Sequence, residues 1–124
     1  MTLAVALVTV AAGGLAAVIR YLVSVALARS SDAEGFPWAV LAVNVVGSAL
    51  GGVVLGLAQH AAMPADLQLI LLTGVCGGLT TFSTFSVETV QLARAGRWRA
   101  ASLSVGANLA LGLAACALGF LLTA

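Results

Sequence analysis

The sequence predicts an all-α membrane protein with four transmembrane helices in a single domain over residues 1–124. Of the 124 residues, 62% are hydrophobic and 7% are charged, and the mean hydropathy is +1.17. A soluble domain of this length needs a more highly charged surface. Four apolar runs are each long enough to cross about 30 Å of hydrocarbon. We expect the helices near residues 3–28, 37–59, 67–93 and 101–122, joined by short connectors.

Composition also argues against several functional classes. The formal net charge is +1, which gives no sign of a nucleic-acid partner. One His and four scattered acids cannot assemble a nucleophile–base pair or a metal cluster, so we do not expect an enzyme. Cys76 and Cys116 lie in apolar runs without ligand-type spacing and are expected to be buried, small apolar residues. No basic residue precedes Arg20, so we expect the first run to be retained rather than cleaved as a signal peptide.

The third run contains the least helix-like stretch of the chain. Gly77-Gly78 followed by Thr80-Thr81 is poor helix material, which predicts a break near Gly77–Thr81. Non-helical backbone at membrane depth persists only where it is buried in protein or lines a polar cavity. A broken helix exposes carbonyls at one half-helix end and N–H groups at the other, which is how membrane proteins build ion sites. The stretch therefore predicts an ion site.

An aromatic pair follows the expected break. Phe82 and Phe85 are three residues apart and share a helix face, which Glu88 continues. Ring edges are electropositive, so the pair is suited to lining a path for a small anion, with the hydroxyls of Ser83 and Thr84 nearby. Ordinary packing is the competing interpretation. A carboxylate beside an anion path is unfavourable, so Glu88 must be protonated, paired or set aside from the path.

Three polar residues on the other helices have two interpretations each. Arg20 either extends to the membrane interface or places a cation at the mouth of an anion path. Asn44 is either a hydrogen-bonding contact between helices or an amide donor that lines a pore. Asn108 shares a face with Ser104, which forms either a second polar strip or a packing contact.

The stretch from Gly74 to Glu88, GVCGGLTTFSTFSVE, resembles the signature of the Fluc (CrcB) family of bacterial fluoride channels. Weaker matches follow in the same order along the rest of the chain, so that the resemblance covers it essentially end to end. They are Gly13-Gly14 with Arg20-Tyr21, Pro37-Trp38 with Val43-Asn44-Val45-Val46-Gly47, and Gly106-Ala107-Asn108-Leu109.

This resemblance implies a four-helix subunit of an antiparallel, dual-topology dimer that passively exports fluoride across the cell membrane and so lowers its toxicity. It implies a structural, non-transported Na⁺ held by the backbone carbonyls of Gly77 and Thr80 from both subunits. A hard cation prefers such oxygen ligands. The fluoride path would comprise Asn44, Phe82, Phe85, Ser83 and Thr84, with Arg20, Glu88 and Asn108 as possible accessory residues. The fourth helix departs from the family's serine track, because Asn108 and Gly112 stand at those positions.

Two other classes remain as alternatives. A small four-helix, dual-topology multidrug or cation exporter shares the size and the dimeric habit. The family that such exporters resemble has an essential acid in its first helix. The first helix of this chain has Arg20 and no acid. A non-transporting assembly subunit would need only the small residues for packing and not the hydroxyl-rich third run.

The arginines predict how the chain inserts into the lipid bilayer. With four spans, the first and third connectors share one side of the membrane, and Arg29, Arg94, Arg97 and Arg99 all belong to that side. The other side has no Arg or Lys, which predicts insertion with both termini outside the cytoplasm. An antiparallel dimer would then need a homologous subunit of opposite bias. A homodimer is the alternative, because few charges give weak topogenic signals.

Overall fold

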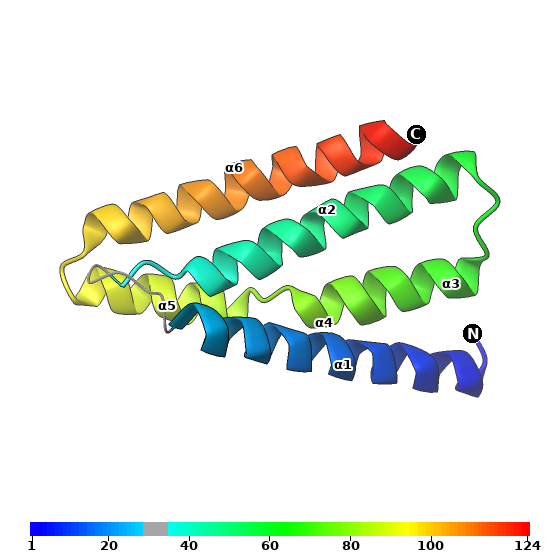
Figure 1. The fold of residues 1–124 in the computed structure, drawn as a ribbon, viewed down its shortest axis with the longest axis horizontal. Helices are drawn as coiled ribbons and strands as arrows, with labels where there is room; N and C mark the ends of the chain where they lie inside the picture. Colours follow the sequence, from blue (N-terminus) through cyan, green and yellow to red (C-terminus); the bar gives the residue numbers. More distant parts are fainter. Residues whose placement is uncertain (29–34) are drawn as a thin grey trace.

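The computed structural model describes residues 1–28 and 35–124, and all regular structure in these residues is helical (Figure 1). The order is α1 Leu3–Ala28, α2 Trp38–His60, α3 Ala65–Leu69, η1 Ile70–Cys76, α4 Gly77–Leu79, α5 Ser83–Arg94 and α6 Trp98–Thr123. Within these residues four segments are long and apolar enough to span a membrane, and the third is composed of α3, η1, α4 and α5. The predicted fold class, with a broken third helix, is therefore confirmed.

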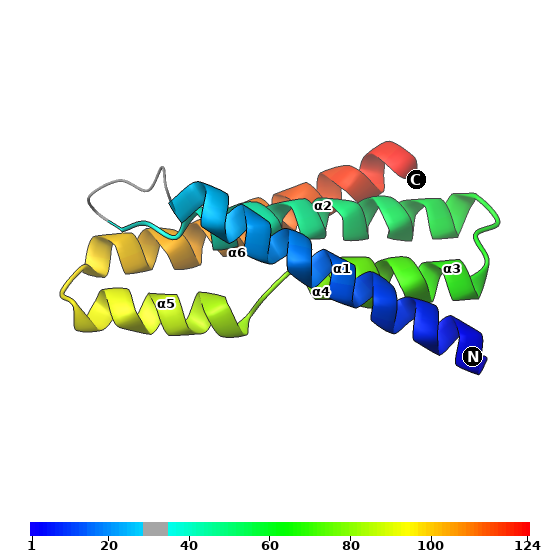
Figure 2. The same cartoon turned by 60° about the horizontal axis from the view of Figure 1, so that its bottom comes forward.

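The third span breaks between α4 and α5. The last helical bond of α4 is donated by the Thr80 amide to the Cys76 carbonyl, 3.0 Å away. Thr80 itself is extended, with ψ of 157°, and α5 begins at Ser83. Figure 2 shows this link as an extended stretch between the two helices. The predicted cause was partly wrong, since Gly77 and Gly78 are both helical and the break lies after them.

Two neighbouring threonines explain why the break lies where it does. The Thr80 hydroxyl donates to the Cys76 carbonyl over 2.9 Å, a back-bond that competes with helix continuation. The Thr81 hydroxyl accepts a hydrogen bond of 3.1 Å from the Thr84 amide, which is the geometry of a helix N-cap. The Thr80 hydroxyl therefore bonds at the end of α4, and the Thr81 hydroxyl bonds at the start of α5.

Glycines let α1 cross the first half of the third span at close range. A Cβ on Gly78 would collide with the Gly13 carbonyl of α1. A Cβ on Gly74 would lie 2.8 Å from the Thr9 carbonyl, also on α1. Gly74 lies in η1, a π-helical segment that the sequence did not predict. Gly78 thus allows close packing against α1, and the break follows from Thr80 and Thr81 instead.

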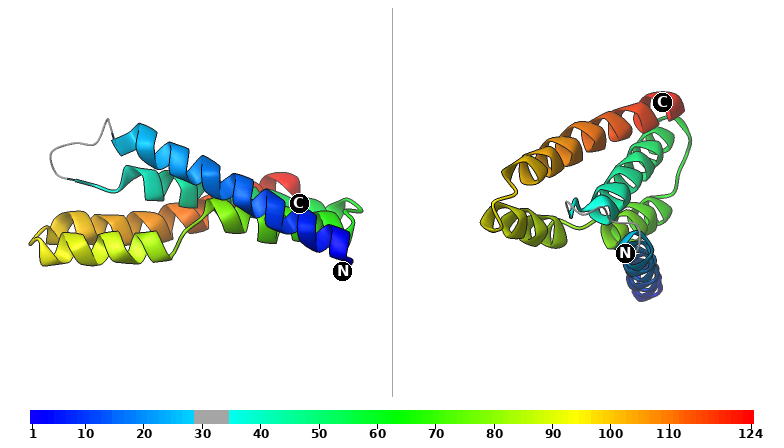
Figure 3. Two further views of the ribbon diagram at one scale, coloured as in Figure 1. Left: turned by 90° about the horizontal axis from the view of Figure 1, so that it is seen from below. Right: turned by 60° about the vertical axis from the view of Figure 1, so that its left-hand side comes forward.

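The bundle is assembled from two closely packed pairs. The most extensive helix contact joins α2 to α6, and α1 packs mainly on η1 and α4. Past the break, α5 contacts α6 and lies apart from α1, as the two views of Figure 3 show. The break thus redirects the second half of the third span away from α1 and towards α6.

A glycine turn joins α5 to α6. The Arg97 amide donates to the Leu92 carbonyl over 2.8 Å, and the Gly96 amide donates to the Ala93 carbonyl over 3.1 Å. This pair of bonds is a Schellman motif, which needs a left-handed residue, and Gly96 supplies it with φ of +79°. The turn places Arg94, Arg97 and Arg99 together at one end of the bundle.

Gly78→Ala is expected to lower the thermal stability of the purified protein. Its methyl group meets the backbone of α1, so the two helices must separate, at a cost of about 1–3 kcal/mol for overpacking. Gly14→Ala is the matched control on α1, because a Cβ there meets nothing within 4 Å. Thermal unfolding in one detergent would measure both, and equal midpoints for the two variants would contradict the close crossing.

Candidate functional site

Asn44 of α2 binds the backbone of the break with both ends of its side-chain amide. Its Oδ1 accepts a hydrogen bond of 2.8 Å from the Thr81 amide, and its Nδ2 donates to the Thr81 carbonyl over 3.1 Å. In an unbroken helix the Thr81 amide would bond to the carbonyl of Gly77. Asn44 therefore replaces the helical partner that the break removes.

Asn108 of α6 extends this network to the fourth span. Asn44 Nδ2 also donates to Asn108 Oδ1 over 3.0 Å, and Asn108 Nδ2 donates to the Ser104 carbonyl over 2.8 Å. Ser104 is fully buried, so this polar strip lies inside the fold. Asn44 is thus a hydrogen-bonding contact between helices, and it also contacts the break. The shared face expected for Ser104 and Asn108 is present.

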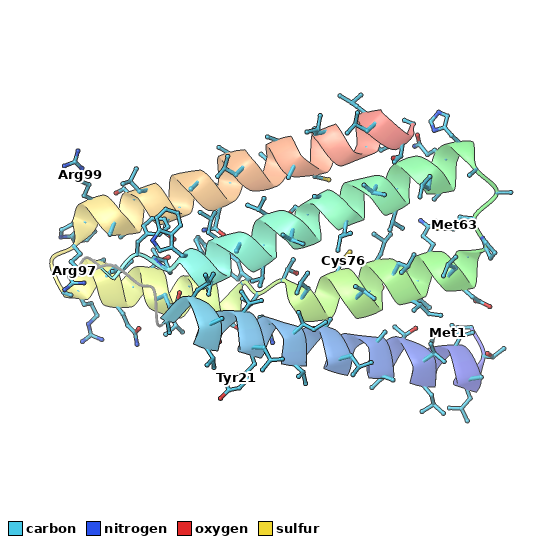
Figure 4. The ribbon with its side chains drawn as sticks, viewed as in Figure 1. Met1, Tyr21, Met63, Cys76, Arg97 and Arg99 are labelled. Atoms are coloured by element: carbon cyan, nitrogen blue, oxygen red, sulfur yellow. The ribbon has the colours of Figure 1, made fainter. Side chains whose placement is uncertain are left out.

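A cavity of about 300 Å³ lies against the break. Four of the predicted residues, Asn44, Phe82, Phe85 and Asn108, line it together. The remaining lining comes from Ser48, Thr80, Thr81 and Leu109. Aromatic, amide and hydroxyl groups from three of the four spans thus meet at one place. Figure 4 shows the side chains on their helices.

The two phenylalanines are held at different depths. Their ring centroids are 5.9 Å apart and the ring planes are inclined at 45°. Phe82 is 80% exposed, whereas Phe85 is half-buried. Phe82 lies at the edge of a cavity that is open on one side of the single chain, and its lining combines apolar rings with a few polar groups.

A second cavity, of about 230 Å³, lies on the other side of Thr81. Thr81 lines both cavities, while Arg20, Thr84 and Glu88 line only the second of these two. The Oε2 atom of Glu88 is buried and has no hydrogen-bond partner among the described residues. Glu88 is therefore set apart from the phenylalanine pair. Ser83 is exposed and lines neither cavity, with its hydroxyl 3.4 Å from that of Thr81.

Arg20 of α1 reaches the break instead of the end of its helix. Its Nη1 donates a hydrogen bond of 3.0 Å to the Thr80 carbonyl, and the residue is half-buried. A guanidinium is always charged, and the C-terminal end of a helix carries partial negative charge. The contact with the last carbonyls of α4 is therefore favourable, and it argues against extension to the membrane interface.

Backbone carbonyls at the end of α4 are the oxygen ligands available for a cation. The described residues contain no group of three or more His, Cys, Asp or Glu side chains placed to hold a metal. The Gly77 carbonyl is released by the break, and Gly77 is exposed. The Thr80 carbonyl accepts from Arg20 and keeps a second lone pair. The donor set fits a hard cation, but one chain supplies too few oxygens to surround it.

Sequence reasoning missed two polar residues of the first cavity, Ser48 and Thr81. Thr81 donates and accepts at the centre of the site, and both of its backbone groups bond to Asn44, whereas the Thr80 amide still bonds to the Cys76 carbonyl of the preceding helix. Ser48 follows Asn44 by four residues and so lies on the same face of α2. That spacing was the available signal for Ser48, whereas the role of Thr81 depends on where the helix breaks.

Comparison with known proteins agrees with the motif of the third span. The profile of the family described as CrcB-like protein, Camphor Resistance (CrcB), matches residues 7–120. A protein of Ruegeria sp. (strain TM1040), named fluoride-specific ion channel FluC, is 43% identical over 109 residues, which cover 88% of this chain and 86% of the relative. The fluoride-specific ion channel FluC 1 of Thermobifida fusca (strain YX) is 40% identical over 114 residues, covering 92% and 91%.

A third relative, fluoride-specific ion channel FluC of Shewanella sp. (strain ANA-3), is 43% identical over 106 residues and 85% of both chains. Family match and identities both extend over nearly all of the sequence, including all four spans. The match and the four apolar helices together make this a multi-pass protein of the cell membrane. The chain belongs to the CrcB family.

Proposed function

We propose that this protein is a fluoride-specific channel that lets fluoride leave the cell passively and so lowers its cytoplasmic concentration. The observation that carries the proposal is the cavity at the break, where two aromatic rings meet amide and hydroxyl groups. Membership of the CrcB family supports it, as do the relatives named fluoride-specific ion channels. An energy source is not required, because the fluoride gradient drives the flow.

The cavity at the break has the chemistry to replace part of the hydration shell of a small anion. Electropositive edges of Phe82 and Phe85 approach the anion without a permanent charge that would trap it. Asn44 already uses both of its Nδ2 hydrogens, one on Thr81 and one on Asn108. An anion passing Asn44 takes the hydrogen now shared with Asn108, and the amide returns to Asn108 afterwards.

The hydroxyl side of the path continues past Thr81 to Thr84 in the second cavity, where Glu88, whose Oε2 has no hydrogen-bond partner among the described residues, must be protonated for an anion to pass. Weak donors at several successive places favour conduction, because an ion must enter each place and also leave it. Ser83 and Thr84 are both exposed, so their hydroxyls serve the path only where a neighbouring surface covers them. The exporter alternative is not favoured, because α1 contains no acid and the relatives are named channels.

Phe82→Ile and Phe85→Ile are each expected to reduce fluoride flux from proteoliposomes by at least about tenfold, equivalent to roughly 1.4 kcal/mol of barrier. Isoleucine keeps the apolar bulk but removes the electropositive ring edge. Phe120→Ile in α6 is the control, since Phe120 lies near the end of its helix and lines neither cavity. Wild-type flux from both variants would contradict the aromatic lining of the path.

A second subunit would close the path that one chain leaves open. Phe82 is 80% exposed, and the cavity it lines is open to the outside of the single chain. An exposed apolar ring at the rim of an open, largely apolar cavity is suited to burial against a partner surface. We therefore place the protein in a dimer, with the two subunits antiparallel as the family resemblance implies.

The dimer also supplies the oxygens that a central Na⁺ needs. Gly77 and Thr80 of both subunits would hold it through their carbonyls, and it would balance the negative helix ends of the two α4 segments. Such an ion is structural, because it stabilises only the assembled state.

Replacing Na⁺ by a large organic cation should weaken dimerisation and flux together. An unchanged dimer by size-exclusion chromatography, with unchanged flux, would contradict the site.

Charge at the two ends of the bundle decides which partner fits. Figure 4 shows Arg97 and Arg99 at the end opposite Met1 and Met63. The end with both termini and the connector from α2 to α3 contains no Arg or Lys. Arg29 lies outside the described residues, and its place in the first connector puts it on the basic side by sequence. The chain is expected to insert mainly with the basic end in the cytoplasm.

An antiparallel partner is then a homologous subunit of opposite bias, and a homodimer is the competing possibility. Expression of this chain alone with a C-terminal reporter distinguishes them. Labelling from outside only, with little flux, is expected for the heterodimer. Equal labelling from both sides together with full fluoride flux would exclude an obligatory second subunit.

A further inference from the structure

Arg20 contacts the backbone at the break in the third span, and this contact indicates a role other than attracting anions. Arg20 lies on α1, sixty positions before the carbonyl that it contacts, and donates to Thr80 O over 3.0 Å. We propose that Arg20 is a positioning residue that fixes the break in the third span by holding the Thr80 carbonyl. The inference rests on the proposed channel function, because the break carries the phenylalanine pair.

The first step of the argument is the hydrogen bonding of the break. The peptide groups of Thr80 and Thr81 lie between two half-helices, so each lacks part of its helical bonding. The Thr80 amide bonds to Cys76, and both backbone groups of Thr81 bond to Asn44. The Thr80 carbonyl is the remaining group, and Arg20 donates to it. Arg20 of α1 and Asn44 of α2 thus hold the same peptide unit, Arg20 through the Thr80 carbonyl and Asn44 through the Thr81 amide, and Asn44 also holds the next carbonyl.

The second step concerns free energy inside a bilayer. An unpaired carbonyl in hydrocarbon is unfavourable, and an unpaired guanidinium is more so. The bond therefore gives the Thr80 carbonyl a partner and uses one of the five N–H donors of Arg20. A lysine at position 20 would keep the positive charge, but its ammonium sits on a shorter side chain and reaches the Thr80 carbonyl less well. A glutamine could donate a hydrogen bond to the same carbonyl without a charge. These differences make the roles of charge and of hydrogen bonding separable.

The third step links the bond to the path. Phe82 follows Thr80 by two residues and lies before the first helical residue of α5, Ser83. Its backbone is thus set by the direction in which the chain leaves Thr80. Without Arg20 this peptide unit is held by Asn44 alone, and a tilt about that remaining bond would change where the Phe82 ring lies relative to Phe85. Arg20 does not line the phenylalanine cavity, so it acts on the path through the backbone.

The experiment compares Arg20→Lys, Arg20→Gln and Arg20→Met with the wild type in constant Na⁺. Two readouts are taken from each reconstituted protein: fluoride efflux, and the infrared carbonyl band of Thr80 isolated by ¹³C=¹⁸O labelling. Loss of a charged donor should move that band to higher frequency in Arg20→Met, with efflux reduced by about tenfold or more. Arg20→Gln, a neutral donor, should restore much of both the band position and the efflux.

Ser24→Ala is the control, because the Ser24 hydroxyl donates to the Tyr21 carbonyl of its own helix and has no bond to the break. If Arg20→Met does not fold, Arg20→Gln and Arg20→Lys give the same comparison. The proposal is overturned if the Thr80 band keeps its wild-type position in the variants, or if it moves while efflux stays unchanged. It is also overturned if efflux follows charge alone, with Lys active and Gln inactive at equal band positions. Absence of efflux from the wild type, reconstituted together with its homologous subunit where that partner is required, would reject the channel function and leave the band test of the Arg20 bond intact.

Discussion

The structure depends on one constraint, which is that a backbone polar group within a bilayer must find a hydrogen-bond partner. Three of the four spans meet it with continuous helices. The third does not, and three residues from other helices, Arg20, Asn44 and Asn108, gather where it fails. The polar residues of the membrane interior are therefore concentrated around the Thr80–Thr81 peptide groups. A site for a polar solute arises at the same place, because the donors that satisfy the backbone also line the neighbouring cavities.

The helices pack closely where glycines, which have no side chain, let two backbones approach each other. The backbone of α1 approaches η1 and α4 at Gly74 and Gly78, and α2 approaches α6 at Gly52, where a Cβ would meet the Cys116 carbonyl. Such approaches favour van der Waals contact and need no large interior side chains. Most large apolar side chains are consequently on the outside, where lipid or a second subunit covers them. The small core of one chain is therefore compatible with a stable assembly in the membrane.

The sequence predicted the four spans and the broken third helix well, because both follow from composition and from hydrophobic run length. Four of the residues that it singled out, Asn44, Phe82, Phe85 and Asn108, line one cavity, whereas Ser83 and Thr84 do not, and the fluoride path itself stays a prediction. The sequence placed the break near Gly77–Thr81, and the break lies at the threonine end of that stretch, whereas Gly77 and Gly78 are helical. Whether a glycine pair ends a helix or admits a neighbouring helix depends on what lies across from it, and that is a tertiary fact. For the same reason the bond from Arg20 to Thr80, the π-helical η1 and the central place of Thr81 could not be read from spacing.

The positions of the partners along the chain have a consequence for biogenesis. Asn44 precedes the Thr81 group that it binds by 37 residues, and Arg20 precedes Thr80 by 60. Synthesis proceeds from the N-terminus, so α1 and α2 leave the ribosome before the broken segment does. The donors for the two exposed peptide groups are thus already available when that segment enters the lipid. Asn108, which comes 64 residues after Asn44, arrives last and completes the network only after the fourth span has inserted.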